Sequence, residues 1–286
     1  MEVNNKYIRF DWAVKRMLRD KANFAVLEGL ITVLLGEKIT ISEILESEGN
    51  QQSESDKFNR VDVMAANTKG EIIIVEVQLS RQLYYLQRIL YGVSKVITEH
   101  MSLGEKYDKV KKVYSINIVY FDLGRGKDYL YHGTTTFTGV HTGDTLEVTA
   151  NEDGEIRRGN PKDVFPEYFI IRVNEFNDVA RTPIEEWLDY LKNNHISDNT
   201  TAPGLCEARE RLLYMTMSDA DRHAYDAHLD AIMVQNDTLD TYYDDGFADG
   251  KKAEAIAIAR KMKSMGIGVD VIEQATGLSA DEINQL

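Results

Sequence analysis

The spacing of apolar and polar residues in the first part of the chain predicts a long helical segment followed by a β-hairpin. Apolar residues recur at helical spacing through residues 6–36, and Gly36 is a suitable point for that segment to end. Residues 41–60 are polar, which predicts a short strand or turn and then a loop. Residues 61–66 and 71–79 are rich in β-forming residues and are joined by Asn-Thr-Lys-Gly, a composition typical of a hairpin turn.

The pattern after the hairpin predicts helices mixed with strands. Residues 80–103 have helical spacing, and residues 113–121, VYSINIVYF, form a nearly continuous apolar run typical of a strand covered on both faces. Shorter β-like segments follow at 129–140 and 167–174. This mixture indicates an α/β or α+β domain.

The pattern becomes helical after Pro183. The segment PIEEWLDYLKNN has proline at a favourable helix start, and further helical segments are predicted at residues 205–217, 219–235 and 252–265. The last residues, VDVIEQATGLSADEINQL, predict two short helices around Gly277. They fit a capping or oligomerising segment, with a small DNA-reading helix-turn-helix as the alternative. We expect three parts along the chain, at residues 1–180, 181–236 and 237–286.

Composition narrows the class of protein. The chain has 286 residues, of which 43% are apolar and 28% charged, as in a soluble protein of one large or two smaller domains. The single cysteine, Cys206, excludes an internal disulfide or a cysteine zinc cluster. The sequence shows neither the apolar core of a signal peptide nor a membrane-spanning apolar run. We therefore expect a cytoplasmic protein without a membrane partner.

The charge of the chain is unevenly divided. A net charge of −14 argues at first against nucleic acid as a partner. Residues 1–130 carry a balance of +1, however, and residues 131–286 carry −15. The acidity therefore lies away from the hairpin, where it fits a solubilising segment, and the hairpin half remains compatible with DNA.

Two carboxylates stand inside the predicted hairpin, although strand interiors disfavour acidic residues. Asp62 lies in the first strand and Glu76 in the second, with Gln78 two positions further on the same face. If Asp62 lies across from Glu76, the two charges repel unless a cation lies between them. Hard oxygen ligands of this kind suit Mg²⁺ or Mn²⁺. The alternative is a solvated sheet face with two incidental acids.

A stripe of residues in the following helix offers phosphate ligands. Tyr84, Arg88, Tyr91 and Lys95 recur at helical spacing, and a guanidinium binds phosphate in a bidentate way. The alternative is an ordinary amphipathic helix whose tyrosines are packed and whose arginine is solvated.

Acids outside the hairpin are further candidates for the site. Asp11 and Lys15 have the spacing of a helix ion pair, whereas Glu28 lies in an apolar face and needs a partner there. Glu46 and Glu48 precede the hairpin. The six histidines and one cysteine form no zinc motif.

The triplet Asp62…Glu76-Val77-Gln78 on a hairpin resembles the core of PD-(D/E)XK nucleases in its Gln variant. Other blocks in the same order make the chain similar to the PD-(D/E)XK nuclease family transposases, also called Rpn-type recombination-promoting nucleases. These blocks are FDWAVKRMLRDKANFAVLEGL, ESEGNQQSESDKFNRVDV, LQRILYGVSK, YSINIVYFDLGRGKDYLYHG and EWLDYLKNN. The resemblance covers about residues 5–286, including the Gly-rich acidic helix and the TGLS tail.

The resemblance implies a restriction-endonuclease-like core with a mixed central sheet and flanking helices, followed by a helical C-terminal region. It implies a Mg²⁺-dependent endonuclease that acts on DNA in recombination or mobile elements. Asp62 and Glu76 would be metal ligands, the Val77 carbonyl a further ligand, and Gln78 would stand where the better-known motif has Lys. In such folds the first helix commonly supplies an acid, which here would be Asp11 or Glu28.

Gln78 is the departure that matters for activity. An amide offers neutral hydrogen bonds where Lys offers a charge, so electrostatic help must come from the metal or from another cation such as Arg88. The alternative hypothesis is a weak or inactive nuclease-fold protein that assembles through its helical tail. Self-association of the C-terminal helix as a homo-oligomer would use the apolar residues Ile256, Met262, Met265, Val271, Ile272 and Ile283.

Overall fold

The computed structural model describes residues 7–286, except for residues 17, 19, 46–60, 102–105 and 153–154. It divides into two compact units, Met1–Met217 and Ser218–Leu286. None of the described helices is both long enough and apolar enough to cross a membrane.

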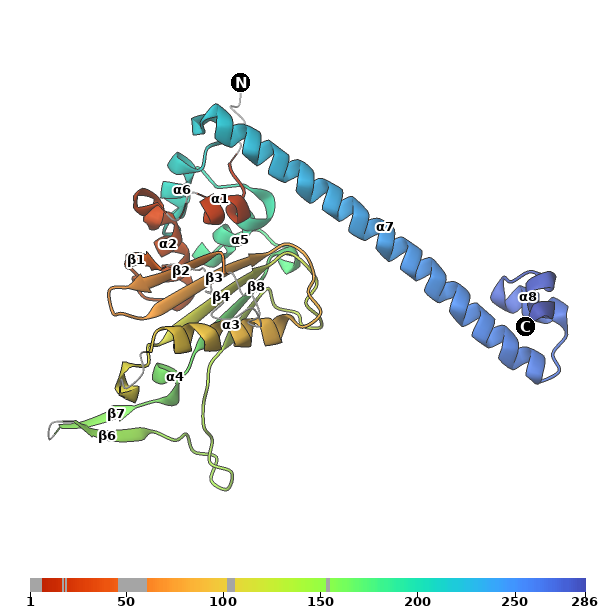
Figure 1. Ribbon diagram of the computed structural model, residues 1–286, viewed down its shortest axis with the longest axis horizontal. Helices are drawn as coiled ribbons and strands as arrows, with labels where there is room; N and C mark the ends of the chain where they lie inside the picture. The colour runs from red at the N-terminus through yellow and green to blue at the C-terminus, as the bar shows by residue number, and fades with distance from the viewer. Residues whose placement is uncertain (1–6, 17, 19, 46–60, 102–105, 153–154) are drawn as a thin grey trace. The chain divides into compact units, whose positions relative to one another are not determined.

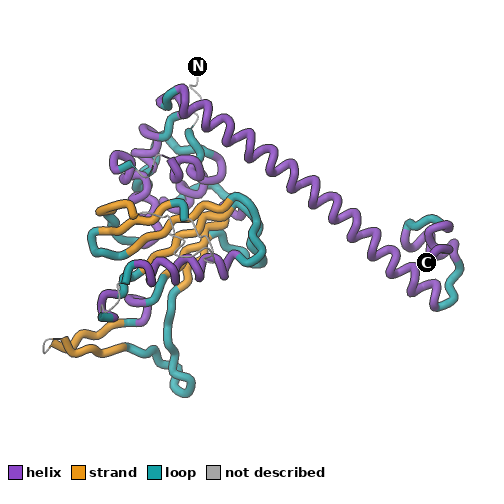
Figure 2. Tube along the Cα trace, viewed as in Figure 1, coloured by secondary structure: helices purple, strands orange, loops and turns teal. Residues whose placement is uncertain are grey.

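The first unit is built around a mixed sheet of six strands in the order β1-β2-β3-β4-β8-β5 (Figures 1 and 2). The central strands β3, β4 and β8 are parallel, and the strands outside them run antiparallel to their neighbours. This confirms the expected mixed sheet with flanking helices. The strands are β1 (Ile41–Leu45), β2 (Val63–Asn67), β3 (Ile72–Gln78), β4 (Val113–Val119), β5 (Leu130–Gly133) and β8 (Glu167–Arg172).

Helices cover both faces of this sheet. In Figure 1, α1, α2, α5 and α6 lie on one face and α3 lies on the other. The α-helices of the unit are α1 (Phe10–Arg16), α2 (Phe24–Leu35), α3 (Tyr85–Glu99), α4 (Pro161–Val164), α5 (Pro183–Asn193) and α6 (Leu205–Arg211). The 3-10 turns are η1 (Lys21–Asn23), η2 (Tyr107–Lys109), η3 (Val173–Glu175) and η4 (Tyr214–Thr216). The segment predicted as one helix over residues 6–36 is therefore two helices joined through η1, which Asp20 caps by accepting the Ala22 N–H.

A separate two-stranded hairpin, which the sequence pattern did not predict, lies between β5 and β8 along the chain, although these two strands pair directly in the sheet. It consists of β6 (Val148–Glu152) and β7 (Glu155–Gly159) and extends away from the sheet in Figure 1.

The turn of the β2–β3 hairpin sets its register. The side-chain oxygen of Asn67 accepts the N–H groups of Lys69 and Glu71 at 3.0 and 2.9 Å. Gly70 has a φ of 78°, a conformation that glycine adopts without steric cost. With the turn held in this way, Val63 pairs with Val75 and the predicted hairpin is confirmed.

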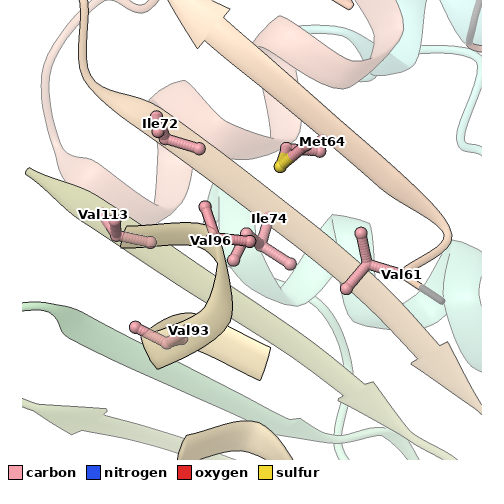
Figure 3. Packing of buried hydrophobic residues seen from close by; sticks show 7 residues of the cluster. All are labelled: Val61, Met64, Ile72, Ile74, Val93, Val96 and Val113. Carbon is pink, nitrogen blue, oxygen red and sulfur yellow. The ribbon is translucent and has the colours of Figure 1, made fainter. Parts of the chain in front are cut away.

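The residues of β3 that lie under α3 are apolar until near the end of that strand. Val93 and Val96 of α3 pack on Ile72 and Ile74 of β3 in a cluster that also contains Met64, Val61 and Val113 (Figure 3). Each of these buried side chains contributes about 1.5–3 kcal/mol to the free energy of folding. Because side chains alternate along a strand, the next residues of β3 on this face are Glu76 and Gln78. Along β3, polar side chains therefore enter this layer only at the carboxyl end, and on β4 the buried polar residues Ser115 and Asn117 lie beside Ile74 and Glu76.

The opposite layer joins distant parts of the chain. Phe10 packs edge-on against Trp187 and Tyr190 at ring distances of 6.0 and 6.3 Å. The hydroxyl of Tyr190 donates to the carbonyl of Ile8, and the N–H of Ile8 donates to the carbonyl of Leu212, each at 2.7 Å. Helices α5 and α6 therefore complete the layer that α1 and α2 begin.

The second unit is helical. It contains α7 (Asp219–Ser264), α8 (Val269–Thr276) and α9 (Ala280–Gln285), and its core is formed by Ala259, Ile272, Leu278 and Ile283. Helix α7 is continuous where two segments were predicted, because Gly246 and Gly250 each cost a helix only about 1 kcal/mol. The two short helices predicted around Gly277 are confirmed, and Gly277 ends α8 with a φ of 73°.

Four of the six residues expected to drive self-association lie within this core or pack against it. Ile272 and Ile283 are completely buried, and Ile256 and Met262 pack on them. Met265 and Val271 remain 69% and 54% exposed. Most of the apolar surface assigned to an oligomer contact is therefore covered inside the unit, and self-association through this segment remains a hypothesis.

Candidate active site

Asp62 and Glu76 meet at the open end of the hairpin. The pair Val63–Val75 begins the β2–β3 ladder, so the next residues outward are Asp62 and Glu76. The main-chain N–H of Val77 donates to Oδ2 of Asp62 at 2.7 Å, which fixes the Asp62 carboxylate against β3. Glu76 is buried, with 5% of its surface exposed, whereas the side chain of Asp62 is 18% exposed. Two carboxylates therefore stand together, one inside the protein and one at its surface.

A cation from each helical layer faces this acid pair. Lys15 Nζ of α1 lies 3.7 Å from Asp62 Oδ1, and Arg88 Nη2 of α3 lies 2.7 Å from Glu76 Oε1. Gln82 holds the guanidinium from the other side by accepting from Arg88 Nη1 at 2.9 Å. These cations offset the repulsion between the two acids, which is the electrostatic function that a bound metal ion would also serve.

The environment of Glu76 favours its protonated form. Burial raises the pKa of Glu76, the nearby charge of Arg88 opposes that rise, and the charge of Asp62 adds to it. Although Arg88 is within ion-pair distance, Oε1 of Glu76 is buried without a hydrogen bond of good geometry. An acceptor of this kind, buried and without a hydrogen bond, has a lone pair available for a further ligand.

Tyr85 adds a second polar atom of this type beside Glu76. Burial, and after it the charge of Glu76, raises the pKa of the Tyr85 phenol, and its buried hydroxyl has no hydrogen-bond partner within the described part of the chain. Its ring packs edge-on against Phe121 at 5.6 Å. Tyr85 therefore remains a neutral phenol that can donate a hydrogen bond. No sequence pattern points to Tyr85, because an aromatic residue at a helix start normally indicates packing.

Gln78 and Val77 are held by main-chain contacts. The Gln78 carbonyl accepts the Tyr120 N–H at 3.0 Å, and the Gln78 side-chain amide donates to the Ser80 carbonyl at 3.3 Å. Gln78 lies on the same face as Glu76, whereas Val77 points into the opposite layer. Only the main chain of Val77 can therefore face the acid pair.

The first-helix acids lie elsewhere. Asp11 is completely buried against Arg9, with Nε and Oδ1 2.9 Å apart. Oε1 of Glu28 accepts the Ile41 N–H at 2.7 Å and so satisfies the first residue of β1. The residue of the first helices that reaches Asp62 is Lys15, which the sequence suggested only as a helix partner of Asp11. Glu46 and Glu48 lie outside the described residues.

Of the predicted stripe on α3, Arg88 is the member that contacts the acid pair. Tyr84 precedes the helix and is 68% exposed, and Tyr91 is 41% exposed. Lys95 Nζ lies 3.7 Å from Glu99 Oε1, four residues further along the same helix. Helical spacing thus identified Arg88, whose guanidinium lies beside Glu76. The other members of the stripe are either exposed, as are the two tyrosines, or paired with Glu99, as is Lys95.

The donor set fits a hard divalent cation. Among the described residues, no group of three or more His, Cys, Asp or Glu side chains could hold a metal ion. The acid pair offers two carboxylates, and the buried Oε1 of Glu76 lacks a hydrogen bond. Mg²⁺ and Mn²⁺ are bound in this way, through one or two carboxylates with waters and substrate phosphate completing the shell.

A cleft of about 180 Å³ opens between the start of α3 and the segment that follows β4. Its lining combines cationic, anionic, amide and apolar side chains, and it includes Tyr85, whose phenol feels the charge of Glu76. The lining residues are Arg81, Gln82, Leu83, Tyr85, Leu86, Gln87, Phe121, Asp122 and Leu123.

Two protein families match parts of the chain. Residues 8–149 match the family described as PD-(D/E)XK nuclease family transposase, and this segment contains Lys15, the acid pair and Arg88. Residues 252–286 match the C-terminal HTH domain of the Rpn/YhgA-like nuclease family. No curated protein and no solved structure matches the chain.

Proposed function

Because this chain belongs to the PD-(D/E)XK nuclease family transposases and carries the C-terminal HTH domain of Rpn/YhgA-like nucleases, we propose that it hydrolyses phosphodiester bonds of DNA. The observation that supports this most directly is the placement of Asp62 and Glu76 just beyond the Val63–Val75 pair of the hairpin, with one cation beside each acid. The reaction is that of an endonuclease acting in recombination or on mobile elements.

Asp62 and Glu76 would hold the metal ion, with the Val77 carbonyl as a further ligand. Bound Mg²⁺ or Mn²⁺ lowers the pKa of a water molecule and neutralises charge that develops on phosphate. Asp62 is ready for this role because the Val77 N–H already orients its carboxylate. Glu76 brings a buried carboxylate whose Oε1 lies 2.7 Å from Arg88 Nη2, so a metal ion would compete with that guanidinium.

Lys15 supplies the charge that Gln78 lacks. Its ammonium group is 3.7 Å from Asp62 and its side chain is 45% exposed, so the ammonium group can turn toward a phosphate without leaving a buried pocket. In the better-known motif a Lys two residues after the Glu provides this charge. Here the cation comes from α1, and the Gln78 amide remains available to orient a water molecule by hydrogen bonds.

Arg88 has two alternative partners in this scheme. In the structure it neutralises Glu76, which needs a counter-ion because it is buried. When a divalent cation takes over that role, the guanidinium becomes available for a substrate phosphate, to which it can donate two parallel hydrogen bonds. Tyr85 can donate a further hydrogen bond from its hydroxyl, which no other described group occupies.

The C-terminal unit supports DNA as the substrate. Helices α8 and α9, joined through Gly277, lie within the segment that matches an HTH domain, and such domains place their second helix in the major groove. In this proposal the first unit cuts DNA and the second unit binds it.

One observation favours a second candidate function. Each acid of the pair already has a cation of the chain beside it, and Gln78 replaces the usual Lys. A protein that kept the fold but lost the reaction would also retain these internal ion pairs. It would act by binding DNA or by assembling through its helical unit.

Nicking of supercoiled plasmid by the purified full-length chain, with Mg²⁺ or with a chelator, separates the two candidates. We expect nicking with Mg²⁺ and none with the chelator. Asp62→Asn should abolish nicking, whereas Asp108→Asn, which removes an exposed acid in η2, should leave it unchanged. Nicking that survives the chelator and both substitutions would come from a contaminant and would contradict the proposal.

A further inference from the structure

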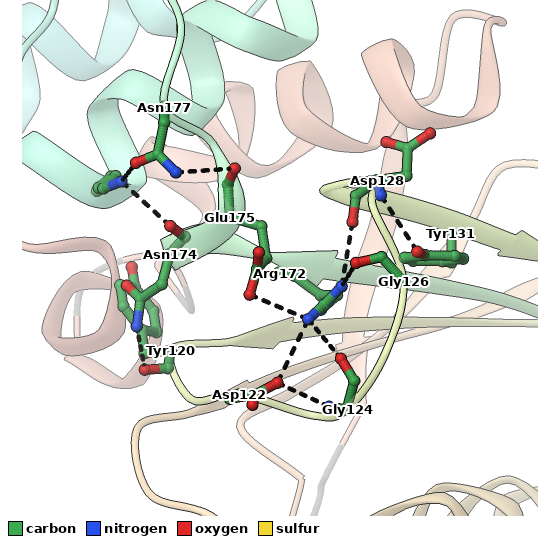
Figure 4. Close-up of polar contacts among 11 residues, drawn as sticks. Tyr120, Asp122, Gly124, Gly126, Asp128, Tyr131, Arg172, Asn174, Glu175 and Asn177 are labelled. Atoms are coloured by element: carbon green, nitrogen blue, oxygen red, sulfur yellow. Dashed lines mark hydrogen bonds and ion pairs between the residues drawn. The ribbon is translucent and has the colours of Figure 1, made fainter.

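Arg172 binds the loop that follows β4. It ends β8 and is 4% exposed. Nη1 donates to the carbonyls of Gly126 and Asp128 at 3.0 and 3.4 Å, and Nη2 donates to the carbonyl of Gly124 at 2.8 Å (Figure 4). Three carbonyls from alternate residues therefore converge on one guanidinium.

Two acids neutralise this buried cation. Asp122 and Glu175 lie 3.4 and 3.0 Å from Nη2 of Arg172. A buried charge costs several kcal/mol unless it is paired, so these acids allow Arg172 to stay inside the protein. The negative charge at the base of the loop is thus engaged with Arg172.

Glycine permits the shape of this loop. Gly124 and Gly126 have φ values of 136° and 154°, within the range that only glycine adopts readily. A Cβ atom on Gly126 would overlap the hydroxyl of Tyr131, which accepts the Asp128 N–H at 3.2 Å. The backbone is therefore held from both sides, and the loop is ordered by the protein itself.

The residues between the bound carbonyls are cations. Arg125 and Lys127 are exposed, and among the described residues neither takes part in a hydrogen bond or an ion pair. Two residues apart, they lie at most about 7 Å from each other along the chain. Asp128, which follows Lys127 in the sequence, uses Oδ1 to accept the Leu130 N–H at 3.1 Å.

The loop lies at the same edge of the sheet as the acid pair. The ladder pairs Arg172 with Val119, and Val119 with Gln78. The anchor of the loop is therefore two strands, or about 10 Å, from the end of β3. The cleft at the start of α3 is lined on its other side by Asp122 and Leu123 at the start of the loop.

We propose that the loop Asp122–Asp128 is a preformed contact for the sugar-phosphate backbone of DNA, made by Arg125 and Lys127. The role of this contact in bringing DNA to the acid pair rests on the proposed function, but the binding of DNA by the loop does not. Pre-ordering by Arg172 means that little conformational entropy is lost when the two cations meet phosphate. Contacts of this kind position a duplex without reading its sequence.

Binding of a fluorescent DNA duplex by the full-length chain, measured by anisotropy over a series of salt concentrations, tests this contact. All variants carry Asp62→Asn to prevent cleavage, and a chelator is present. Arg125→Ala with Lys127→Ala should weaken binding on the order of tenfold and lower the salt slope by about 1.8, which corresponds to two phosphates. The matched control, Lys38→Ala with Lys111→Ala, removes two exposed cations near the starts of β1 and β4, at the opposite edge of the sheet, and should leave the slope unchanged.

An unchanged slope in the Arg125/Lys127 variant, or an equal loss in the control, would overturn the assignment. The result is independent of catalysis. If the wild-type chain does not cut DNA but the slope falls as expected, the loop contact stands and the nuclease proposal fails. If the wild-type chain cuts DNA and the salt slope of the variant does not change, the nuclease proposal stands and the loop contact fails.

Discussion

Arg88 Nη2 contacts Glu76 Oε1 at 2.7 Å, so a cation of the chain occupies one side of the carboxylate that a metal ion would need. Binding of a divalent cation must then compete with the guanidinium, and the outcome depends on which positive charge Glu76 holds more strongly. This competition makes Arg88 a residue whose removal should affect metal binding and catalysis in opposite directions.

Arg88→Gln should raise the affinity for Mn²⁺ by up to about tenfold, because a positive charge next to the ligands is lost. The same substitution should slow DNA nicking, because no guanidinium is left for phosphate. Arg88→Lys keeps the charge and serves as the control. Calorimetric titration with Mn²⁺ gives the first quantity and plasmid nicking the second. A parallel fall in both would mean that Arg88 only supports the fold.

Conservative replacement of either acid should abolish cleavage without unfolding the protein. Asp62→Asn and Glu76→Gln should each reduce nicking by at least about 100-fold, since even residues behind metal ligands commonly cost 10–100-fold. Glutamine rather than alanine is needed at position 76, because Glu76 is buried and a smaller residue would leave a cavity. Thermal unfolding by circular dichroism checks that both variants are folded. Near wild-type nicking by a folded variant would remove that acid from the site.

The role of Lys15 can be tested by moving its charge. Lys15→Met should reduce nicking by at least about tenfold, because the phosphate loses a cation that acts in a partly desolvated site. Gln78→Lys alone should keep or raise activity. In the Lys15→Met background, Gln78→Lys should restore much of what was lost. If restoration is absent while the double variant binds Mn²⁺ normally, Lys15 has a function other than supplying charge.

Neutralising either charged neighbour of Glu76 should shift the pKa of Glu76, and the two shifts should have opposite directions. Burial raises this pKa above the ordinary value of about 4.3, so the protonated form, which cannot bind a cation, persists to higher pH than in a typical Glu. Mn²⁺ affinity should therefore fall as the pH is lowered through this raised value. In the metal-free protein, Asp62→Asn should lower the pKa of Glu76, and Arg88→Gln should raise it. Carbon-13 NMR of labelled Glu side chains measures both, and shifts of the same sign would contradict the geometry.

Two glycine-to-alanine substitutions in helices should have opposite effects on stability. A Cβ on Gly29 of α2 would overlap the backbone of Gly204, so Gly29→Ala should destabilise the first unit by about 3 kcal/mol or more. Gly250 of α7 has nothing within 4 Å of its Cβ position, and Gly250→Ala should stabilise the helical unit by about 0.5–1 kcal/mol.

The two units can be followed separately in urea. Both tryptophans, Trp12 and Trp187, belong to the first unit, so fluorescence reports on that unit while far-UV circular dichroism includes α7. A stable Gly29→Ala variant would mean that α2 and α6 can move apart without cost.

How much the sequence predicts depends on how local each feature is. The meeting of Asp62 with Glu76 follows from a short turn and a strand period of two, both of which are visible in 22 consecutive residues. The contact of Lys15 with Asp62 joins two elements far apart in sequence, and Lys15 lies at an ordinary surface position of its helix. No periodicity could distinguish it from a solvated lysine.

Other differences have equally physical causes. Glu28 was attractive as a site residue because it stands in an apolar face, but the partner it needed is a main-chain N–H of β1. The sequence pattern predicted separate helices at 219–235 and 252–265, yet α7 continues through Gly246 and Gly250 between them. In each case the sequence identified an unusual residue, and long-range packing or helix cooperativity determined its role.

The hydrogen bond between Ile8 and Leu212 has a consequence for synthesis of the protein. The layer over one face of the sheet is closed by residues about 200 positions apart, so it cannot form until the ribosome has made both. At 5–20 residues per second, that interval is roughly 10–40 s. During it the residues of the β2–β3 hairpin have already been synthesised, while Phe10 still lacks Trp187 and Tyr190. A chain ending at residue 149 would never acquire that cover, and a high contact order of this kind makes folding slow and dependent on the nearly complete unit.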